Sequence, residues 1–174
     1  MSRILILFIV MIVTVIGILD ISYPLKAIQG YVIVDKWGSM GADDGEFNIP
    51  HSMAFDNFGN IYVTDTDNNR IQKFSSDGKF ITKWGSEGTG DGQFLLPLGI
   101  DLDSRNQIFV VDRLASNVQE FSSNGTFSPQ RLKAESIGGG NLTILEDIEI
   151  DKSDNIYLTD RGNHSIIKYD RMES

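Results

Sequence analysis

Short runs of consecutive apolar residues recur along the chain, and an aspartate ends each run. Residues 61–65 (IYVTD), 108–112 (IFVVD) and 156–160 (IYLTD) show this most clearly. An apolar run without alternation is typical of a strand that is covered on both faces. Further apolar runs flank them, separated by turn residues such as Ser-Asp-Gly at 76–78. The pattern therefore predicts an all-β chain of short strands.

These strands belong to a repeat. The segment 56–75 returns as 103–122 and again as 151–170, at spacings of 47 and 48 residues. A period in the forties, built from short strands and turns, is typical of the four-stranded antiparallel blade of a β-propeller. The blade units are expected at about 50–84, 97–132 and 145–171. We call the strands of each unit a, b, c and d in chain order.

The number of strands leaves the two ends of the repeat unmatched. Residues 31–37 read as a strand d without a blade, and the last unit ends after strand c at Arg171, which gives 12 strands in all. That is three blades, too few to close, because propellers have about four to eight blades. We therefore predict half of a six-bladed ring and a head-to-tail homodimer in which residues 31–36 complete the partner's third blade. A fragment of a larger propeller with no independent role is the alternative.

Specific residues in these positions carry a family resemblance. A proline six residues before an aspartate is followed by Gly-Asn-Ile-Tyr-Val-Thr-Asp, by Asn-x-Arg-Ile-Gln-Lys-Phe and by Lys-Trp-Gly. This order resembles the NHL repeat family of β-propellers over residues 31–171, most closely over 36–84. The third unit lacks the proline and departs from the pattern at Gly138.

The N-terminal segment lies outside the repeat. Residues 4–19 are 16 residues without a charge, between Arg3 and Asp20. A helix of that length spans about 24 Å, which suits a signal-peptide core or a short membrane anchor. The best cleavage position has a large leucine at Leu25, so we expect an uncleaved signal-anchor helix over residues 1–22.

A linker over residues 23–30 would join this anchor to the propeller. The charge bias places the N-terminus inside and the propeller outside the cytoplasm. Removal of the segment as a signal peptide, which would give a secreted protein, is the alternative.

Composition excludes several classes of function. The net charge is −9 and the pI near 4.6, with no basic run, whereas a nucleic-acid-binding protein needs a basic surface to displace counterions from phosphate. There is no cysteine, which excludes disulfides, thiolate catalysis and cysteine-ligated zinc.

The loops that join strand b to c and strand d to a emerge on one face, because successive strands alternate in direction. The candidate binding residues on this face are His51, Asp67, Asn68, Arg113, Glu146, Arg161 and His164. The repeat places His51, Leu98 and Glu146 at equivalent positions at the mouth of the channel. Function is sought where such positions vary.

In propeller enzymes similar to NHL proteins, histidines or carboxylates at this mouth hold a metal, and the amidating lyases bind zinc there. Here only His51 matches, and Leu98 cannot be a ligand. We therefore expect no cofactor, no metal and no catalytic set. The leading hypothesis is a membrane-anchored module outside the cytoplasm that binds a protein, peptide or glycan. The alternative is a metal-assisted lyase or lactonase-like hydrolase that uses His51 and Glu146.

The aspartates that end strand b have a structural interpretation. Asp65, Asp112 and Asp160 occur in all three units. Their carboxylates can accept hydrogen bonds from backbone N–H groups of the turn between strands b and c. We expect this role rather than catalysis.

Overall fold

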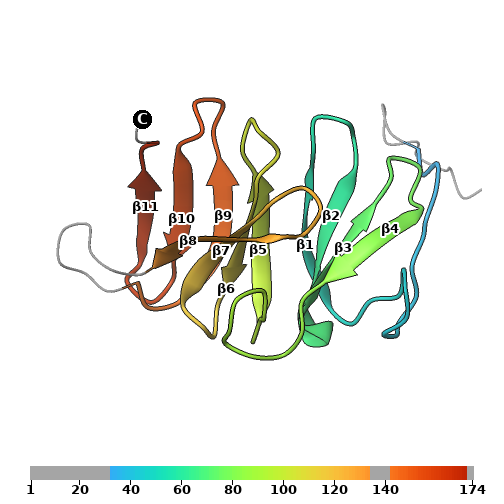
Figure 1. The fold of residues 1–174 in the computed structure, drawn as a ribbon, viewed down its shortest axis with the longest axis horizontal. Helices are drawn as coiled ribbons and strands as arrows, with labels where there is room; N and C mark the ends of the chain where they lie inside the picture. The colour runs from blue at the N-terminus through green and yellow to red at the C-terminus, as the bar shows by residue number, and fades with distance from the viewer. Residues whose placement is uncertain (1–31, 134–141, 172–174) are drawn as a thin grey trace, which may run out of the picture. The chain divides into compact units, whose positions relative to one another are not determined.

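A computed structural model describes residues 32–133 and 142–171. Residues 37–174 form one compact unit, which contains all the strands. In its described part eleven strands form three antiparallel sheets, and a single turn of 3-10 helix, η1 (Thr66–Asn68), is the one helix. The prediction of an all-β propeller fold is confirmed (Figure 1).

Each sheet is one blade. Blade 1 contains β1 (Pro50–Phe55), β2 (Ile61–Asp65), β3 (Arg70–Phe74) and β4 (Phe80–Trp84). Blade 2 contains β5 (Pro97–Leu102), β6 (Ile108–Asp112), β7 (Asn117–Phe121) and β8 (Phe127–Lys133). Blade 3 contains β9 (Leu145–Ile150), β10 (Ile156–Asp160) and β11 (Ser165–Tyr169), and has three strands within the described residues.

The blades pack in chain order through their first strands. β1 contacts β5, and β5 contacts β9, so that β5 lies between the other two (Figure 1). Apolar clusters fill both junctions, one around Tyr62, Phe94 and Phe121 and the other around Phe109 and Leu158. All residues of β2 and β6 are buried, which explains why their sequences do not alternate.

An aspartate organises each turn between strands a and b. In blade 1 the Asp56 Oδ1 atom accepts hydrogen bonds from the backbone N–H groups of Phe58 and Asn60, both at 2.9 Å. Burial raises the pKa of Asp56, but the hydrogen bonds from Asn60 and Phe58 outweigh burial and hold the pKa below its usual value. Asp103 and Asp151 accept the same kind of backbone bonds in the other blades. These carboxylates therefore fix the turns.

Two segments that the sequence assigns to strand d differ from the regular repeat. Residues 32–37, which the repeat predicts as a strand d, form no strand, because a strand needs a neighbouring backbone to pair with. β8 forms although it contains Pro129, and its pairing with β7 shifts register between Gln119 and Phe121. Pro129 lies on the outer strand of its sheet, where a missing N–H group is tolerated.

The expected anchor helix (1–22) and the linker (23–30) lie outside the described residues. Among the residues that are described, no helix is long and apolar enough to cross a membrane.

Candidate functional site

The turns between strands b and c are built on buried aspartates. In blade 1, Asp65 Oδ2 accepts from Arg70 Nε at 2.7 Å and from Gln72 Nε2 at 3.0 Å, and Oδ1 accepts from the Asn48 backbone N–H at 2.7 Å. Asn68 donates its amide to both oxygens of Asp65. Asp65 and Arg70 are both buried, and their ion pair holds the loop before β1 against the blade.

The equivalent aspartate of blade 3, Asp160, is held mainly by backbone N–H groups, because Ser165 and Ile167 replace Arg70 and Gln72. The Asp160 carboxylate accepts from the backbone N–H groups of Thr143, Ile144 and Gly162 at 3.1–3.2 Å. Burial raises the pKa of Asp160, but the bonds from Ile144, Thr143 and Asn163 outweigh it and lower the pKa to about 2. Asp160 is therefore charged at neutral pH and acts as a structural group rather than a proton donor.

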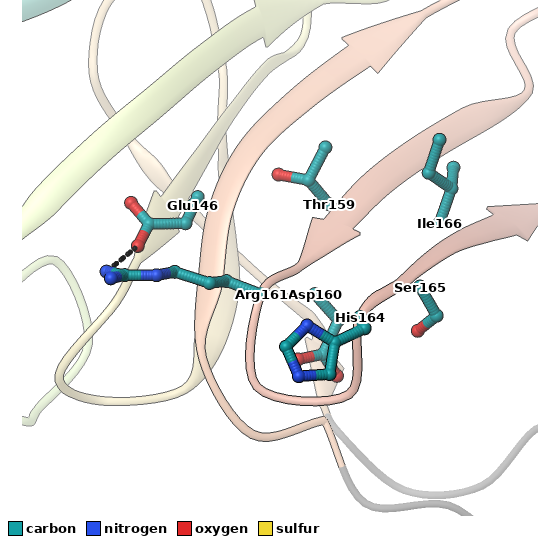
Figure 2. Close-up of a pocket in the computed structure, with 7 residues that line it drawn as sticks. All are labelled: Glu146, Thr159, Asp160, Arg161, His164, Ser165 and Ile166. Carbon is teal, nitrogen blue, oxygen red and sulfur yellow. Dashed lines mark hydrogen bonds and ion pairs between the residues drawn. The ribbon is translucent and has the colours of Figure 1, made fainter.

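Two blades share an arginine–glutamate–arginine cluster on this face. Glu146 Oε1 lies 3.4 Å from Arg113 Nη1 of blade 2 and 3.2 Å from Arg161 Nη1 of its own blade. Figure 2 shows Arg161 reaching back to Glu146. The Arg161 side chain is 65% exposed, so its guanidinium keeps donor capacity for a carboxylate or carbonyl group of a ligand.

A cavity of about 320 Å³ opens beside this cluster on blade 3 (Figure 2). Its lining residues are Glu146, Thr159, Asp160, Arg161, His164, Ser165 and Ile166. Glu146, Arg161 and His164 are residues that the sequence singles out. Ile166 is 73% exposed, so the cavity combines an apolar wall with a charged rim.

The other candidate residues do not line this cavity. His51 is exposed on β1, and Asp67 is exposed in η1. Asn68 is occupied by Asp65 and by the Gly41 carbonyl, to which it donates at 2.9 Å. The part of the chain that the structure describes contains no group of three or more His, Cys, Asp or Glu side chains able to hold a metal ion.

Sequence reasoning missed Thr159, Ser165 and Ile166. It searched for departures from the repeat at the channel mouth, whereas Thr159 and Ile166 match residues of the first unit, and Ser165 lies at the start of strand c. Thr159 stands at the position of Thr64, and Ile166 at that of Ile71. The sequence did offer a signal: Thr159 and Ile166 keep the same residue types that face the next blade at Thr64 and Ile71.

A second cavity, of about 300 Å³, lies on the opposite face. The turns between strands a and b of all three blades line it, with residues such as Asn57, Asn106 and Asp154. Asn57 donates its backbone N–H to Asn106 Oδ1 at 2.9 Å, and Ser104 Oγ donates to Asp154 Oδ2 at 2.9 Å. The polar groups here already pair with one another across the blades.

Comparison with known proteins agrees with this architecture. A family model described as NHL repeat matches residues 47–74, and one described as 6-bladed beta-propeller matches residues 102–173. The chain is 40% identical to human NHL repeat-containing protein 3 over 53 residues, which is 30% of this chain and 15% of that protein. It therefore spans a small part of the length of this relative.

Solved structures show the same fold at low sequence identity. Virginiamycin B lyase from Staphylococcus aureus matches with a TM-score of 0.51 and 16% identity, over 72% of this chain and 42% of the lyase. A Bacteroides caccae protein of unknown function matches with a TM-score of 0.55 and 13% identity, over 70% of this chain and 46% of that one. The repeat match and the propeller match together show that this chain contains NHL-type repeat sequence within a β-propeller fold.

Proposed function

We propose that the protein is a binding module whose ligand is a protein, peptide or glycan and which performs no reaction. The observation that carries this proposal is the cluster of Arg113, Glu146 and Arg161, which presents donors at 30% and 65% side-chain exposure on the face of the b–c turns. Binding sites on repeat folds lie on such turns, supported by a rigid scaffold.

A peptide and glycan array probed with the full chain tests this proposal. An Arg113→Ala/Arg161→Ala variant is expected to lose the captured ligands. Lys152→Ala, on an exposed a–b turn of the opposite face, is the matched control and should retain them. Ligands that bind both variants equally, or turnover of a small molecule, would contradict the proposal.

We also propose that residues 4–19 anchor the protein in a membrane, with the propeller outside the cytoplasm. Sixteen uncharged residues between Arg3 and Asp20 support this. We expect the face with His51 and Arg113 to point away from the membrane. Biotin labelling of cysteines introduced at Asp67 or at Lys152 in intact cells distinguishes the faces, and labelling restricted to position 152 would contradict the orientation.

The enzymatic alternative, a metal-assisted lyase or lactonase-like hydrolase, rests on His51 and Glu146. Metal analysis of the purified protein, with His51→Ala as the comparison, tests it directly. Bound zinc or calcium that this substitution removes would favour the alternative over the binding module.

Finally, we propose that two chains assemble head to tail into one six-bladed ring. The three described blades and the unmatched ends of the repeat support this assembly.

A further inference from the structure

The junction between blades 1 and 2 shows how a b–c turn receives the next blade. Thr64 Oγ1 donates to the Leu98 carbonyl at 2.8 Å, and Asn69 Nδ2 donates to the Leu95 carbonyl at 3.0 Å. Both acceptors belong to residues 95–98, which lead into blade 2. The turn of one blade therefore holds the entering segment of the next.

The junction between blades 2 and 3 repeats this contact. Ser116 Oγ donates to the Thr143 carbonyl at 3.2 Å. Ser116 is the repeat equivalent of Asn69, and Thr143 that of Leu95. Arg113 adds its ion pair to Glu146. The entering segment here is residues 143–146.

Blade 3 has the same b–c turn with no entering segment in it among the described residues. His164 stands at the position of Ser116, with φ of 52° against 50°. Thr159 and Ile166 are exposed and, together with His164, line the open cavity of Figure 2. This cavity is therefore a blade junction with one side missing.

The exposed face of blade 1 has the entering segment that such a junction needs. Residues 48–51 are the equivalents of 95–98, and no blade precedes them among the described residues. Ile49 is 58% exposed and has φ of 53°, a conformation that is strained for a β-branched residue. Met53 is 61% exposed, whereas its equivalent Ile100 is 3% exposed.

We infer that the blade 3 cavity receives residues 48–51 of a second copy of this chain, an inference that rests on the proposed two-chain ring. By equivalence with the internal junctions, Thr159 donates to the carbonyl of residue 51 and His164 to the carbonyl of residue 48. The three described blades cannot fill this cavity themselves, because a ring of three blades does not close.

The two tryptophans support this assignment independently. A Cβ atom at Gly125 would lie 2.6 Å from Trp84, because the ring of this last residue of β4 covers the c–d turn of the following blade. A Cβ at Gly78 would lie 2.9 Å from Trp37 in the same way. Trp37 therefore occupies the position that ends the strand d of a blade preceding blade 1.

That strand d would be residues 33–37, 47 positions before β4; we call it the clasp segment. β4 pairs with β3 with Thr82 opposite Lys73. The equivalent pairing sets Asp35 of the clasp segment opposite Lys168 of β11, which is opposite in charge. A second copy thus supplies both the entering segment and the fourth strand that blade 3 lacks.

Cross-linking of co-expressed full chains tests the assignment, and the absence of native cysteine makes it specific. One tagged chain carries His51→Cys and a differently tagged chain carries Thr159→Cys. Mild oxidation, which joins two close thiols directly as a disulfide, should give a product with both tags at the mass of two chains. Each variant expressed alone should give none.

The internal junction provides the matched control. Thr64→Cys and Leu98→Cys on separate chains should give no mixed product, while both in one chain should give an internal cross-link. Ile166→Asp should raise the dimer dissociation constant about 100-fold, because it buries an unpaired charge, and Ile81→Asp, on the exposed side of β4, should not.

A cross-link between two chains that both carry His51→Cys, or between two chains that both carry Thr159→Cys, would show that the chains associate in another way and would overturn the assignment. If the internal control cross-links but no mixed product forms, the assignment is also overturned. Array binding without a mixed product contradicts this inference alone. A mixed product without array binding contradicts only the binding module.

Discussion

Ile71 and Ile166 occupy the same position of the repeat, in strand c of blades 1 and 3. Ile71 is fully buried and Ile166 is 73% exposed. Their sequences and sheet registers correspond, with Ile71 opposite Thr64 and Ile166 opposite Thr159. The difference lies in what covers them: blade 2 packs over Ile71, whereas the face of blade 3 that carries Ile166 points away from blade 2 and has no described blade on it. The comparison teaches that the exposed end face of blade 3 carries the same apolar residue that is buried between blades 1 and 2, as expected for a face that packs against another blade.

The largest expected effect comes from a buried group that holds the loop before β1 against blade 1. Asp65→Asn removes the partner of Arg70, which is itself buried. The free energy of unfolding should fall by about 3–5 kcal/mol, because a buried charge is left unpaired. Urea unfolding of the full chain measures it. Asp67→Asn, on the exposed turn beside it, should change stability by less than about 0.5 kcal/mol, and an equal loss would contradict the structural role of Asp65.

Truncation of the two isoleucines tests the comparison itself. Ile71→Ala should lower the free energy of unfolding by about 2–4 kcal/mol through the cavity that it creates. Ile166→Ala should have little effect at low protein concentration, where single chains prevail. At high concentration it should become destabilising, because the dimer buries this residue. A concentration-independent effect of Ile166→Ala would contradict a buried role in the dimer.

These contrasts mark what could be predicted from sequence. The repeat period fixed the fold class because each strand carries its own apolar run and turn aspartate. Exposure of Ile166 could not be predicted, since its local sequence matches that of Ile71 and the two blades differ only in which face blade 2 covers. Residues 32–37 read as a strand, but they form none in the structure, where no strand of the described residues pairs with them.

The candidate site was predicted only in part. The alternation of strand direction placed Arg113, Glu146 and Arg161 on one face, but not the ion pairs that join them across two blades. Thr159 was missed because it follows the repeat, and a search for departures overlooks such a residue.

The low pKa of Asp160 predicts acid sensitivity at the blade 3 turn. Its folded-state pKa of about 2 lies below its ordinary value of 3.8. The stabilisation is therefore complete above the ordinary value and is lost as the pH falls through about 2. Unfolding measured from pH 5 to pH 2 should show this loss in the parent chain. Asp160→Asn should be less stable at pH 5 and should have a shallower slope; an unchanged slope would contradict the assignment.

The smallest expected effect on stability comes from removing the hydroxyl group of Thr64 or of Thr159. Thr64→Val removes a buried hydrogen bond to Leu98 and should cost about 1 kcal/mol of stability. Thr159→Val removes only an exposed hydrogen bond from the Asp147 N–H, so it should cost the single chain less than Thr64→Val does and should also weaken the association of two chains. Unfolding at two protein concentrations separates these cases, and equal losses in both variants at low concentration would erase the distinction between filled and open junctions.

The mass of the full chain, solubilised and measured by native mass spectrometry, tests the central claim most directly. Two chains of 19.4 kDa each should leave the detergent as one dimer, and Ile166→Asp should shift that dimer to single chains. A well-folded single chain at every concentration, with the blade 3 cavity open, would contradict the claim that the end faces are two halves of one junction.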